Sequence, residues 1–166
     1  MLNFAICDDN VNILDKFSKI LENIFVKHGY DAKVGISTND VNKLLDYIDD
    51  NKTDVLILDI NLKSDKSGLE VASRVRERNK DTYFIFTTAH LEYAMMAYKF
   101  KTFDYLAKPV TSDRLEETIV RLFDDINGQP KRYLKIDNKK TIIDESEILY
   151  IRRDGMKLIF HTKSRD

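Results

Sequence analysis

The stretch FAICDD, residues 4–9, is an apolar run that ends in two adjacent carboxylates. An unbroken apolar run is typical of a strand that is covered on both faces of a sheet. Two neighbouring carboxylates resist joint ionisation unless another group offsets their charge. Acidic residues also end strands for ordinary reasons, and Asp9 or Asn10 could cap a following helix. The stretch alone leaves both a structural and a functional interpretation open.

The first 126 residues alternate strand-like and helix-like patterns, which predicts an α/β fold with a parallel sheet and helices on both faces. The predicted strands are LNFAIC (2–7), AKVGIS (32–37), DVLILD (54–59), YFIFTTA (83–89) and FDYLA (103–107). Apolar residues at helical spacing predict helices over 11–28, from 41 onward, and over 68–78, 91–100 and 113–126. Thr38 or Asn39 is the expected cap of the second helix.

The pattern changes after residue 126. NGQPKR, residues 127–132, contains glycine and proline and reads as a linker. The stretches RYLKID (132–137), KTIID (140–144), EILYIRR (147–153) and KLIFHT (157–162) then alternate like short strands with no helix between them. We therefore expect one domain over 1–126, a linker over 127–132 and a separate, incomplete all-β unit over 133–166.

The composition indicates a soluble globular protein, because 43% of the 166 residues are hydrophobic and 33% are charged. The single cysteine, Cys7, excludes an intrachain disulfide and fits a reducing compartment. No apolar stretch is long enough to span a membrane, so we expect a cytoplasmic protein with no membrane association. Residues 131–166 are basic, which fits either a nucleic-acid partner or a solvated surface.

Polar and charged residues follow the predicted strands at the edge where parallel sheets bind ligands. Each of them has an ordinary explanation when it is taken alone, as a turn, strand or surface residue. Their joint occurrence, at one end of successive strands, favours a functional site. The residues concerned are Asp8, Asp9, Asp59, Thr87, Thr88 and Lys108.

Three carboxylates in one pocket repel each other unless a cation joins them. Hard oxygen ligands with room for water suit Mg²⁺, which also binds phosphate oxygens. Asp59 could then attack phosphorus and hold it as an aspartyl phosphate. A lysine and a hydroxyl beside it would stabilise the oxygens of the transferred group.

Four motifs, in this order, resemble the receiver domain of bacterial two-component response regulators: CDDN (7–10), VLILDINL (55–62), TTAH (87–90) and DYLAKP (104–109). The resemblance implies a flavodoxin-like fold with five parallel strands in the order 2-1-3-4-5. It also implies a signalling protein that accepts phosphate from a sensor histidine kinase and catalyses only its own phosphorylation and dephosphorylation.

The resemblance assigns a role to each residue of the strand-end cluster. Asp59 is the expected phosphoacceptor and Lys108 its cationic neighbour. Asp9 matches the direct Mg²⁺ ligand, and Asp8 matches the acid that acts largely through water. Asn61 falls where the family offers a backbone carbonyl to the metal.

The resemblance also implies a conformational switch. Thr88 matches the switch hydroxyl and Tyr105 the switch aromatic, whereas Thr87 is one residue out of phase and is expected to point away. The Lys108–Pro109 bond resembles one that is cis in the family. Residues 90–107 are the face expected to change, and this face would favour a phosphorylation-dependent homodimer.

The loop after Asp59 departs from the usual receiver pattern. Leu62 and Lys63 stand where most receivers have Met-Pro, and Gly68 lies nine residues after the acceptor rather than eight. This longer and more polar loop resembles that of regulators of the accessory-gene-regulator type.

The segment 133–166 resembles the beginning of a LytTR DNA-binding domain, with EILYIRRDGMKLIFHT (147–162) as the best match. The resemblance implies that the full-length protein regulates transcription from promoter DNA. It makes Arg152, Arg153 and Lys157 candidate DNA contacts, although the same residues could form a plain polar hairpin turn. About 34 residues rarely fold alone, so we expect a truncated regulator whose own sequence-specific DNA binding is weak or absent.

Two other functions have less support in the sequence. A phosphatase of the haloacid-dehalogenase type needs a second aspartate two residues after its nucleophile and a threonine two further on, where this chain has Asn61 and Lys63. A flavodoxin-like binding module needs a loop rich in Ser, Thr or Gly after the first strand. The acidic DDNVN (8–12) would instead repel phosphate in the absence of a metal.

Overall fold

The computed structural model describes residues 1–62, 67–89, 100, 102–128, 133–136, 141–144, 148–155 and 157–162. The chain folds into two compact units, Met1–Val120 and Arg121–Asp166. The predicted domain boundaries at 126 and 133 remain predictions.

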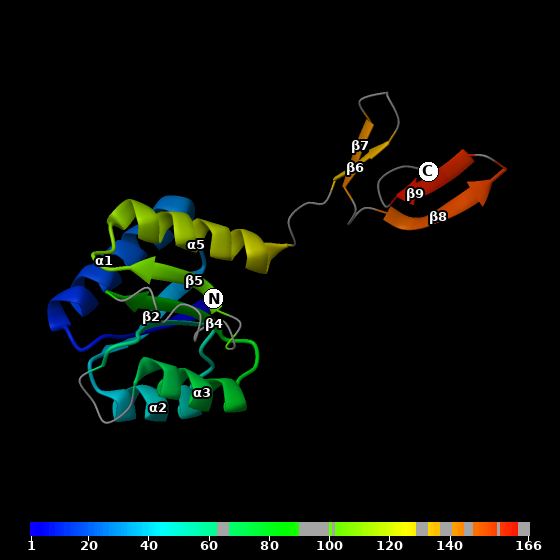
Figure 1. Ribbon diagram of the computed structural model, residues 1–166. Coiled ribbons are helices and arrows are strands. Elements are labelled where there is room, and N and C mark those ends of the chain that lie inside the picture. The colour runs from blue at the N-terminus through cyan, green and yellow to red at the C-terminus, as the bar shows by residue number, and fades with distance from the viewer. Residues whose placement is uncertain are drawn as a thin grey trace. The chain divides into compact units, whose positions relative to one another are not determined.

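A five-stranded parallel sheet forms the centre of the first unit (Figure 1). Its order is β2-β1-β3-β4-β5, which confirms the order expected from the motifs. Neighbouring strands pair in parallel, so all five carboxyl ends meet at one edge of the sheet. The strands are β1 (Leu2–Cys7), β2 (Ala32–Thr38), β3 (Val55–Asp59), β4 (Tyr83–Thr88) and β5 (Thr102–Ala107).

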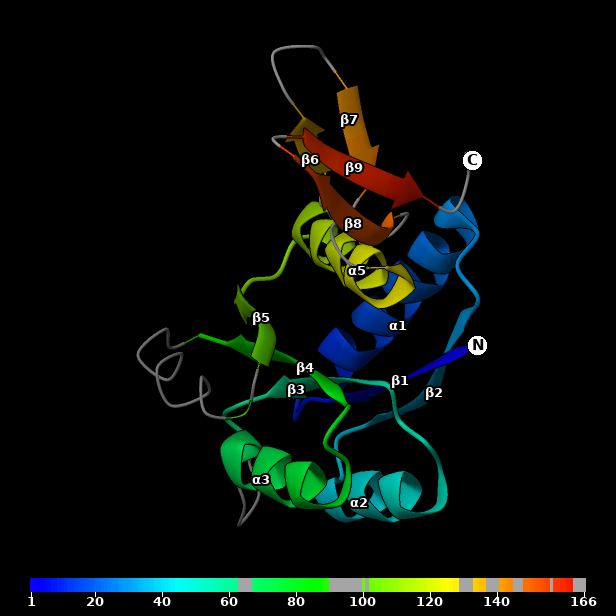
Figure 2. The same ribbon diagram turned by 90° about the vertical axis from the view of Figure 1, so that its right-hand side faces the viewer.

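Helices cover both faces of this sheet (Figures 1 and 2). Helices α2 (Val41–Asp50) and α3 (Gly68–Arg78) lie on one face. Helix α1 (Val11–His28) and the first part of α5 (Ser112–Asn127) lie on the other. The helix predicted over 91–100 falls outside the described residues except for Phe100.

The apolar strand runs are explained by burial on both faces. Alternate strand residues pack into one core with side chains of α2 and α3. Their neighbours along each strand must point to the opposite face, because side chains alternate along a strand. The strand residues in the α2/α3 core are Ala5, Cys7, Leu56, Leu58, Phe84 and Phe86.

Side-chain caps fix where three helices begin. The side chain of Asn10 accepts a hydrogen bond from the Asn12 backbone N–H, which confirms one of the two predicted caps of α1. Ser67 and Glu70 form a capping box at the start of α3. The prediction for α2 was wrong: Asp40 is the cap, and the Thr38 hydroxyl instead accepts from the Asp40 backbone N–H at 3.0 Å.

Arg76 joins the end of α3 to the start of β5. Its guanidinium donates to the carbonyl oxygens of Thr82 (2.9 Å) and Phe100 (2.8 Å), and it lies 4.5 Å from the centre of the Phe84 ring. The same group donates to the carbonyl of Asn79 just beyond the helix. One side chain thus holds the loop before β4 and the entry to β5.

The second unit contains two antiparallel hairpins. Strand β6 (Tyr133–Ile136) pairs with β7 (Thr141–Asp144), and β8 (Ile148–Asp154) pairs with β9 (Lys157–Thr162). Three of these short strands fall within the stretches predicted from alternation, and β8 extends one residue beyond its predicted stretch, to Asp154. Gly155, with φ of 60°, supplies the left-handed conformation at the β8–β9 turn.

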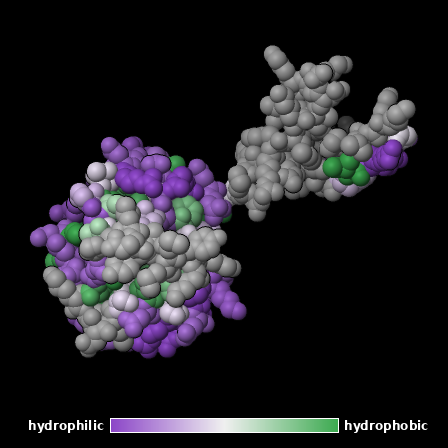
Figure 3. Space-filling model, in the orientation of Figure 1, coloured by the Kyte–Doolittle hydropathy of each residue, from purple (hydrophilic) through white to green (hydrophobic). Residues whose placement is uncertain are grey.

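On the face of the first unit that Figure 3 shows, the described surface is mostly hydrophilic, with apolar residues scattered among charged ones. Within the part of the chain that the structure describes, we find no helix whose length and hydropathy would let it cross a bilayer.

We predict that Gly68→Ala destabilises the fold. The Gly68 N–H donates to the Ile60 carbonyl at 2.9 Å, and a Cβ at position 68 would lie 2.1 Å from the Asp59 carbonyl oxygen. The helix must shift to relieve this clash, so we expect a loss of about 1–3 kcal/mol in the free energy of unfolding, measured by urea denaturation.

The matched control is Glu77→Ala at an exposed position of the same helix. It should change the free energy of unfolding by less than about 0.5 kcal/mol. A Gly68→Ala variant as stable as this control would show that α3 can move away from the strand at no cost.

Candidate functional site

Three carboxylates meet at the carboxyl edge of the sheet. Asp8 and Asp9 follow β1, and Asp59 ends β3, its direct neighbour in the sheet. Each residue offers an oxygen, and these oxygens lie within 4.8 Å of one another. Asp8 and Asp59 are buried and Asp9 is partly exposed. The predicted convergence of these carboxylates is therefore present in the fold.

Lys108 bridges the two buried carboxylates. Its Nζ lies 2.7 Å from Asp8 Oδ2 and 2.7 Å from Asp59 Oδ2. The Lys108 backbone N–H donates to the Thr88 carbonyl at 2.8 Å, which continues the β4–β5 ladder to this residue. The Lys108–Pro109 peptide bond is cis, as the motif implied.

The other oxygen of each carboxylate is held by its own loop. Asp8 Oδ1 accepts from the Asn10 backbone N–H at 2.9 Å, and Asp59 Oδ1 accepts from the Asn61 backbone N–H at 3.1 Å. Each side chain is thus oriented by one local donor and by the shared lysine. The metal role of the Asn61 carbonyl remains a prediction.

Burial and pairing move the protonation equilibria in the cluster. Burial raises the pKa of Asp8 above its ordinary value, although hydrogen bonds from Lys108 and Asn10 act in the opposite direction. Burial alone would lower the pKa of Lys108, but its hydrogen bonds to Asp59 and Asp8 outweigh burial and raise it.

One ammonium faces three carboxylates, so ionised carboxylates leave the cluster with negative charge. Converging carboxylate oxygens are the ligand type of hard divalent cations. The residues present therefore fit a site for such a cation.

The two predicted switch residues lie on the α2/α3 side of the sheet. Thr88 is fully buried at the end of β4. Tyr105 on β5 pairs in register with Phe86, and their ring centres are 6.2 Å apart. Thr88 and Tyr105 therefore face the same core, as a coupled pair requires.

Thr87 points to the opposite face from Thr88, as expected from strand alternation. The cross-strand pairing adds what the sequence could not show: Thr87 pairs in register with Asp59. Both residues therefore lie on the same face of the sheet. Residue type alone could not reveal this pairing, because two adjacent threonines in a sequence carry no information about strand register.

Cys7 precedes the cluster and is buried in the α2/α3 core. Burial first, and then the neighbouring carboxylates, raise the pKa of its thiol to about 12. These properties fit the predicted role of a small core side chain.

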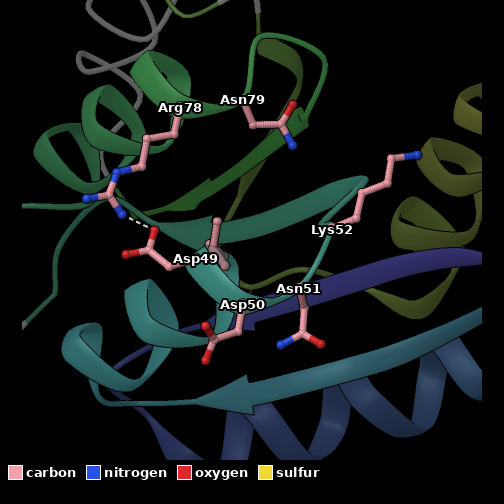
Figure 4. Close-up of a pocket in the computed structure, with 7 residues that line it drawn as sticks. Asp49, Asp50, Asn51, Lys52, Arg78 and Asn79 are labelled. Atoms are coloured by element: carbon pink, nitrogen blue, oxygen red, sulfur yellow. Dashed lines mark hydrogen bonds and ion pairs between the residues drawn. The ribbon is translucent and has the colours of Figure 1, made fainter.

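Two pockets flank different ends of the sheet. One of about 360 Å³ lies beside the site, where Ile13 and Phe17 of α1 face Pro109 and Val110. The other, of about 320 Å³, is lined by residues 48–52 with Arg78 and Asn79 (Figure 4). Arg78 points to Asp49 there and forms an ion pair with it. That pocket lies at the ends of α2 and α3, away from Asp8, Asp9 and Asp59.

Two of the candidate DNA contacts lie on β8. Arg152 and Arg153 are exposed, and Arg153 Nε donates to the Gly155 carbonyl at 3.0 Å. Lys157 begins β9, but its side chain is not among those described. Tyr150 stacks on His161 across the hairpin with ring centres 4.3 Å apart. The roles of Arg152, Arg153 and Lys157 in DNA binding stay predictions.

Residues 4–120 match the model of the response regulator receiver domain, so the chain belongs to this family of signalling proteins. The sensory transduction protein LytT of Bacillus subtilis (strain 168) is 26% identical over 162 residues, covering 90% of this chain and 64% of that protein. The chain spans less than two thirds of the length of that protein and of two other curated relatives named LytT.

Solved structures share this fold. The response regulatory domain of protein mrkE from Klebsiella pneumoniae superposes with a TM-score of 0.69 at 23% identity, covering 77% of this chain and 100% of that one. The response regulator protein TrrA from Thermotoga maritima, solved in complex with Mg(2+)-BeF, gives 0.61 at 25% identity over 74% of this chain and 99% of that one. The phosphatase and flavodoxin-like alternatives gain no support.

We predict that Cys7 resists alkylation in the folded chain. Its pKa of about 12 leaves almost no reactive thiolate near pH 8, and burial blocks access. Iodoacetamide should label the folded chain about 100-fold more slowly, or slower still, than the chain unfolded in urea.

The pH dependence gives a second check on Cys7. The thiol has its ordinary pKa of 9.0 in the unfolded chain, whereas burial raises this pKa to about 12 in the folded chain. The thiol's contribution to stability is therefore complete below pH 9.0 and is lost as the pH rises toward 12. Equal labelling rates for folded and unfolded chain would contradict the buried position.

Proposed function

We propose that this chain is the receiver-containing part of a cytoplasmic response regulator, which accepts a phosphoryl group on Asp59 from a sensor histidine kinase. The supporting observation is the bridge from Lys108 to both Asp59 and Asp8 inside a carboxylate cluster. A buried acceptor beside a cation and further acids is suited to phosphoryl transfer, because that reaction depends on positioning and charge stabilisation.

In this proposal, an oxygen of Asp59 attacks the phosphorus of the kinase's phosphohistidine. The new O–P bond forms as the N–P bond breaks, and the electron pair of that bond remains on the departing imidazole. The Lys108 ammonium turns from the Asp59 carboxylate to an oxygen of the transferred group. The Thr88 hydroxyl donates to another of those oxygens. The chain catalyses only this reaction and its own dephosphorylation.

We assign Mg²⁺ to the acidic cluster. Asp9, Asp59 and the Asn61 backbone carbonyl would hold it directly, and Asp8 would act largely through water. When bound, the ion neutralises part of the charge on the phosphoryl oxygens. The related protein TrrA, whose structure contains Mg(2+)-BeF, supports this assignment.

We further propose that phosphorylation shifts Thr88 and Tyr105 together. Thr88 moves toward a phosphoryl oxygen, and Tyr105 turns into the space that Thr88 leaves. This is a population shift between two packings, biased by the new contacts of the phosphoryl group. Residues 90–107 form the face that changes, and this change favours a homodimer.

For the whole regulator, we propose transcriptional control through a LytTR-type unit that begins at residue 133, after a linker over 127–132 that follows the receiver at 1–126. Arg152, Arg153 and Lys157 would neutralise promoter phosphates or approach base edges. The 166-residue chain itself should bind DNA weakly and without sequence preference, and salt should weaken that binding further.

We predict that Asp59 is the sole phosphoacceptor. Incubation with acetyl phosphate and Mg²⁺ should add one phosphoryl group to the wild-type chain and none to Asp59→Asn, as read by intact mass. Lys108→Met should slow the reaction by about 100-fold, because it removes the cation that stabilises the transferred group.

Two controls accompany this experiment. Asp50→Asn, at an exposed position at the end of α2, should be phosphorylated like the wild type. Excess chelator should prevent phosphorylation. A stable phosphoryl group on Asp59→Asn, or full phosphorylation in chelator, would refute the acceptor or the metal role, respectively.

We predict that phosphorylation drives dimerisation. Sedimentation of the wild-type chain with beryllofluoride and Mg²⁺ should show a higher mass than sedimentation of the free chain. The mimic should raise the mass of the Thr88→Val variant less, because this variant lacks the hydroxyl that would move toward the phosphoryl mimic. The same mass with and without the mimic would count against the dimer.

A further inference from the structure

We propose that Thr87 is a positioning residue for Asp59: its hydroxyl donates to the Asp59 side chain once Asp59 is phosphorylated, and thereby shortens the lifetime of the aspartyl phosphate. This inference rests on the proposed function of Asp59.

The geometry of the sheet brings the two residues together. Asp59 and Thr87 are register partners in the β3–β4 ladder, and the Ile60 N–H donates to the Thr87 carbonyl at 3.1 Å. The residues before them, Leu58 and Phe86, pack into the α2/α3 core. Because side chains alternate along a strand, Asp59 and Thr87 both face the opposite side.

The Thr87 hydroxyl is unusual among the buried threonines. Thr87 is 1% exposed, and its Oγ1 has no hydrogen-bond partner among the described residues. Thr82 Oγ1, in contrast, donates to the Thr53 carbonyl at 2.9 Å, and Thr118 Oγ1 donates to Asp104 Oδ2 at 2.6 Å. A buried hydroxyl without a partner costs stability. A hydrogen-bond acceptor that becomes available in another state of the protein would explain why a threonine occupies position 87.

Phosphorylation makes such an acceptor available. In the free chain, Asp59 Oδ1 accepts from the Asn61 N–H and Oδ2 accepts from Lys108. The phosphoryl oxygens then carry the larger negative charge and draw the Lys108 ammonium away. A rotation of the Thr87 side chain between staggered positions can turn its hydroxyl toward the Asp59 oxygen that has lost its donor.

The new hydrogen bond changes the rate of hydrolysis. Water attacks phosphorus, the bond from phosphorus to Asp59 breaks, and its electron pair stays on the Asp59 carboxylate, while inorganic phosphate and a proton leave. A hydrogen bond to a carboxylate is stronger than one to a neutral carbonyl. The Thr87 hydroxyl therefore stabilises the departing carboxylate more than the intact aspartyl phosphate, and hydrolysis is faster.

The test compares Thr87→Val, which has nearly the same shape, with the wild type. After phosphorylation by acetyl phosphate and removal of the donor, intact mass follows the loss of the phosphoryl group. Thr87→Val should lengthen the half-life by about two- to tenfold, the range expected for one hydrogen bond. Thr87→Ser, which keeps a hydroxyl, should restore a half-life close to that of the wild type.

A second measurement separates positioning from a merely structural effect. Thr87→Val should raise the Tm of the free chain, because it removes a buried hydroxyl without a partner. This gain should shrink or vanish when beryllofluoride and Mg²⁺ are present, because the wild-type hydroxyl then has an acceptor. Thr82→Val, at the residue before β4, should lower the Tm of both forms equally and leave the half-life unchanged.

The outcomes separate the two levels of inference. Equal half-lives for Thr87→Val and the wild type, or an equal change of Tm in both forms, would overturn the role of Thr87 and leave the role of Asp59 intact. A wild-type chain that is neither phosphorylated nor shifted in Tm by the mimic would overturn the proposed function and the role of Thr87 with it.

Discussion

The ammonium of Lys108 holds together two buried carboxylates that would otherwise repel each other. Its contacts to Asp8 and Asp59, both 2.7 Å, join the ends of β1 and β3 to the residue that follows β5. This is possible only because all the strands run in parallel and end at the same edge. The sheet order therefore has a direct electrostatic role, since it brings one positive charge to a cluster of acids.

Because side chains alternate along a strand, the carboxylate site and the predicted switch residues lie on different faces of the sheet. Asp59 and Thr87 face away from the α2/α3 core, whereas Thr88 and Tyr105 face toward it. In the proposed function, events at the acceptor must cross from one face to the other. Two adjacent threonines at the end of β4 span that boundary, and a shift of one residue along the strand would exchange their roles.

Most of the fold could be predicted from the sequence, because long apolar strands and periodic helices leave little choice in an α/β chain. The convergence of Asp8, Asp9, Asp59 and Lys108 followed from the rule that parallel strands share one edge. The cap of α2 was missed because several capping residues stand in a row, and hydrogen bonding selects among them only in the folded chain. The pairing of Thr87 with Asp59 was missed because register depends on contacts between strands.

The contact between Gly68 and the end of β3 has a consequence for the loop that follows Asp59. The hydrogen bond from the Gly68 N–H to the Ile60 carbonyl closes residues 60–68 into a ring whose two ends lie next to Asp59. The entropy of closing such a ring grows only slowly with its length. Residues inserted within it would therefore cost little stability and leave Asp59 in place, so the length of this segment can vary without displacing the carboxylate cluster.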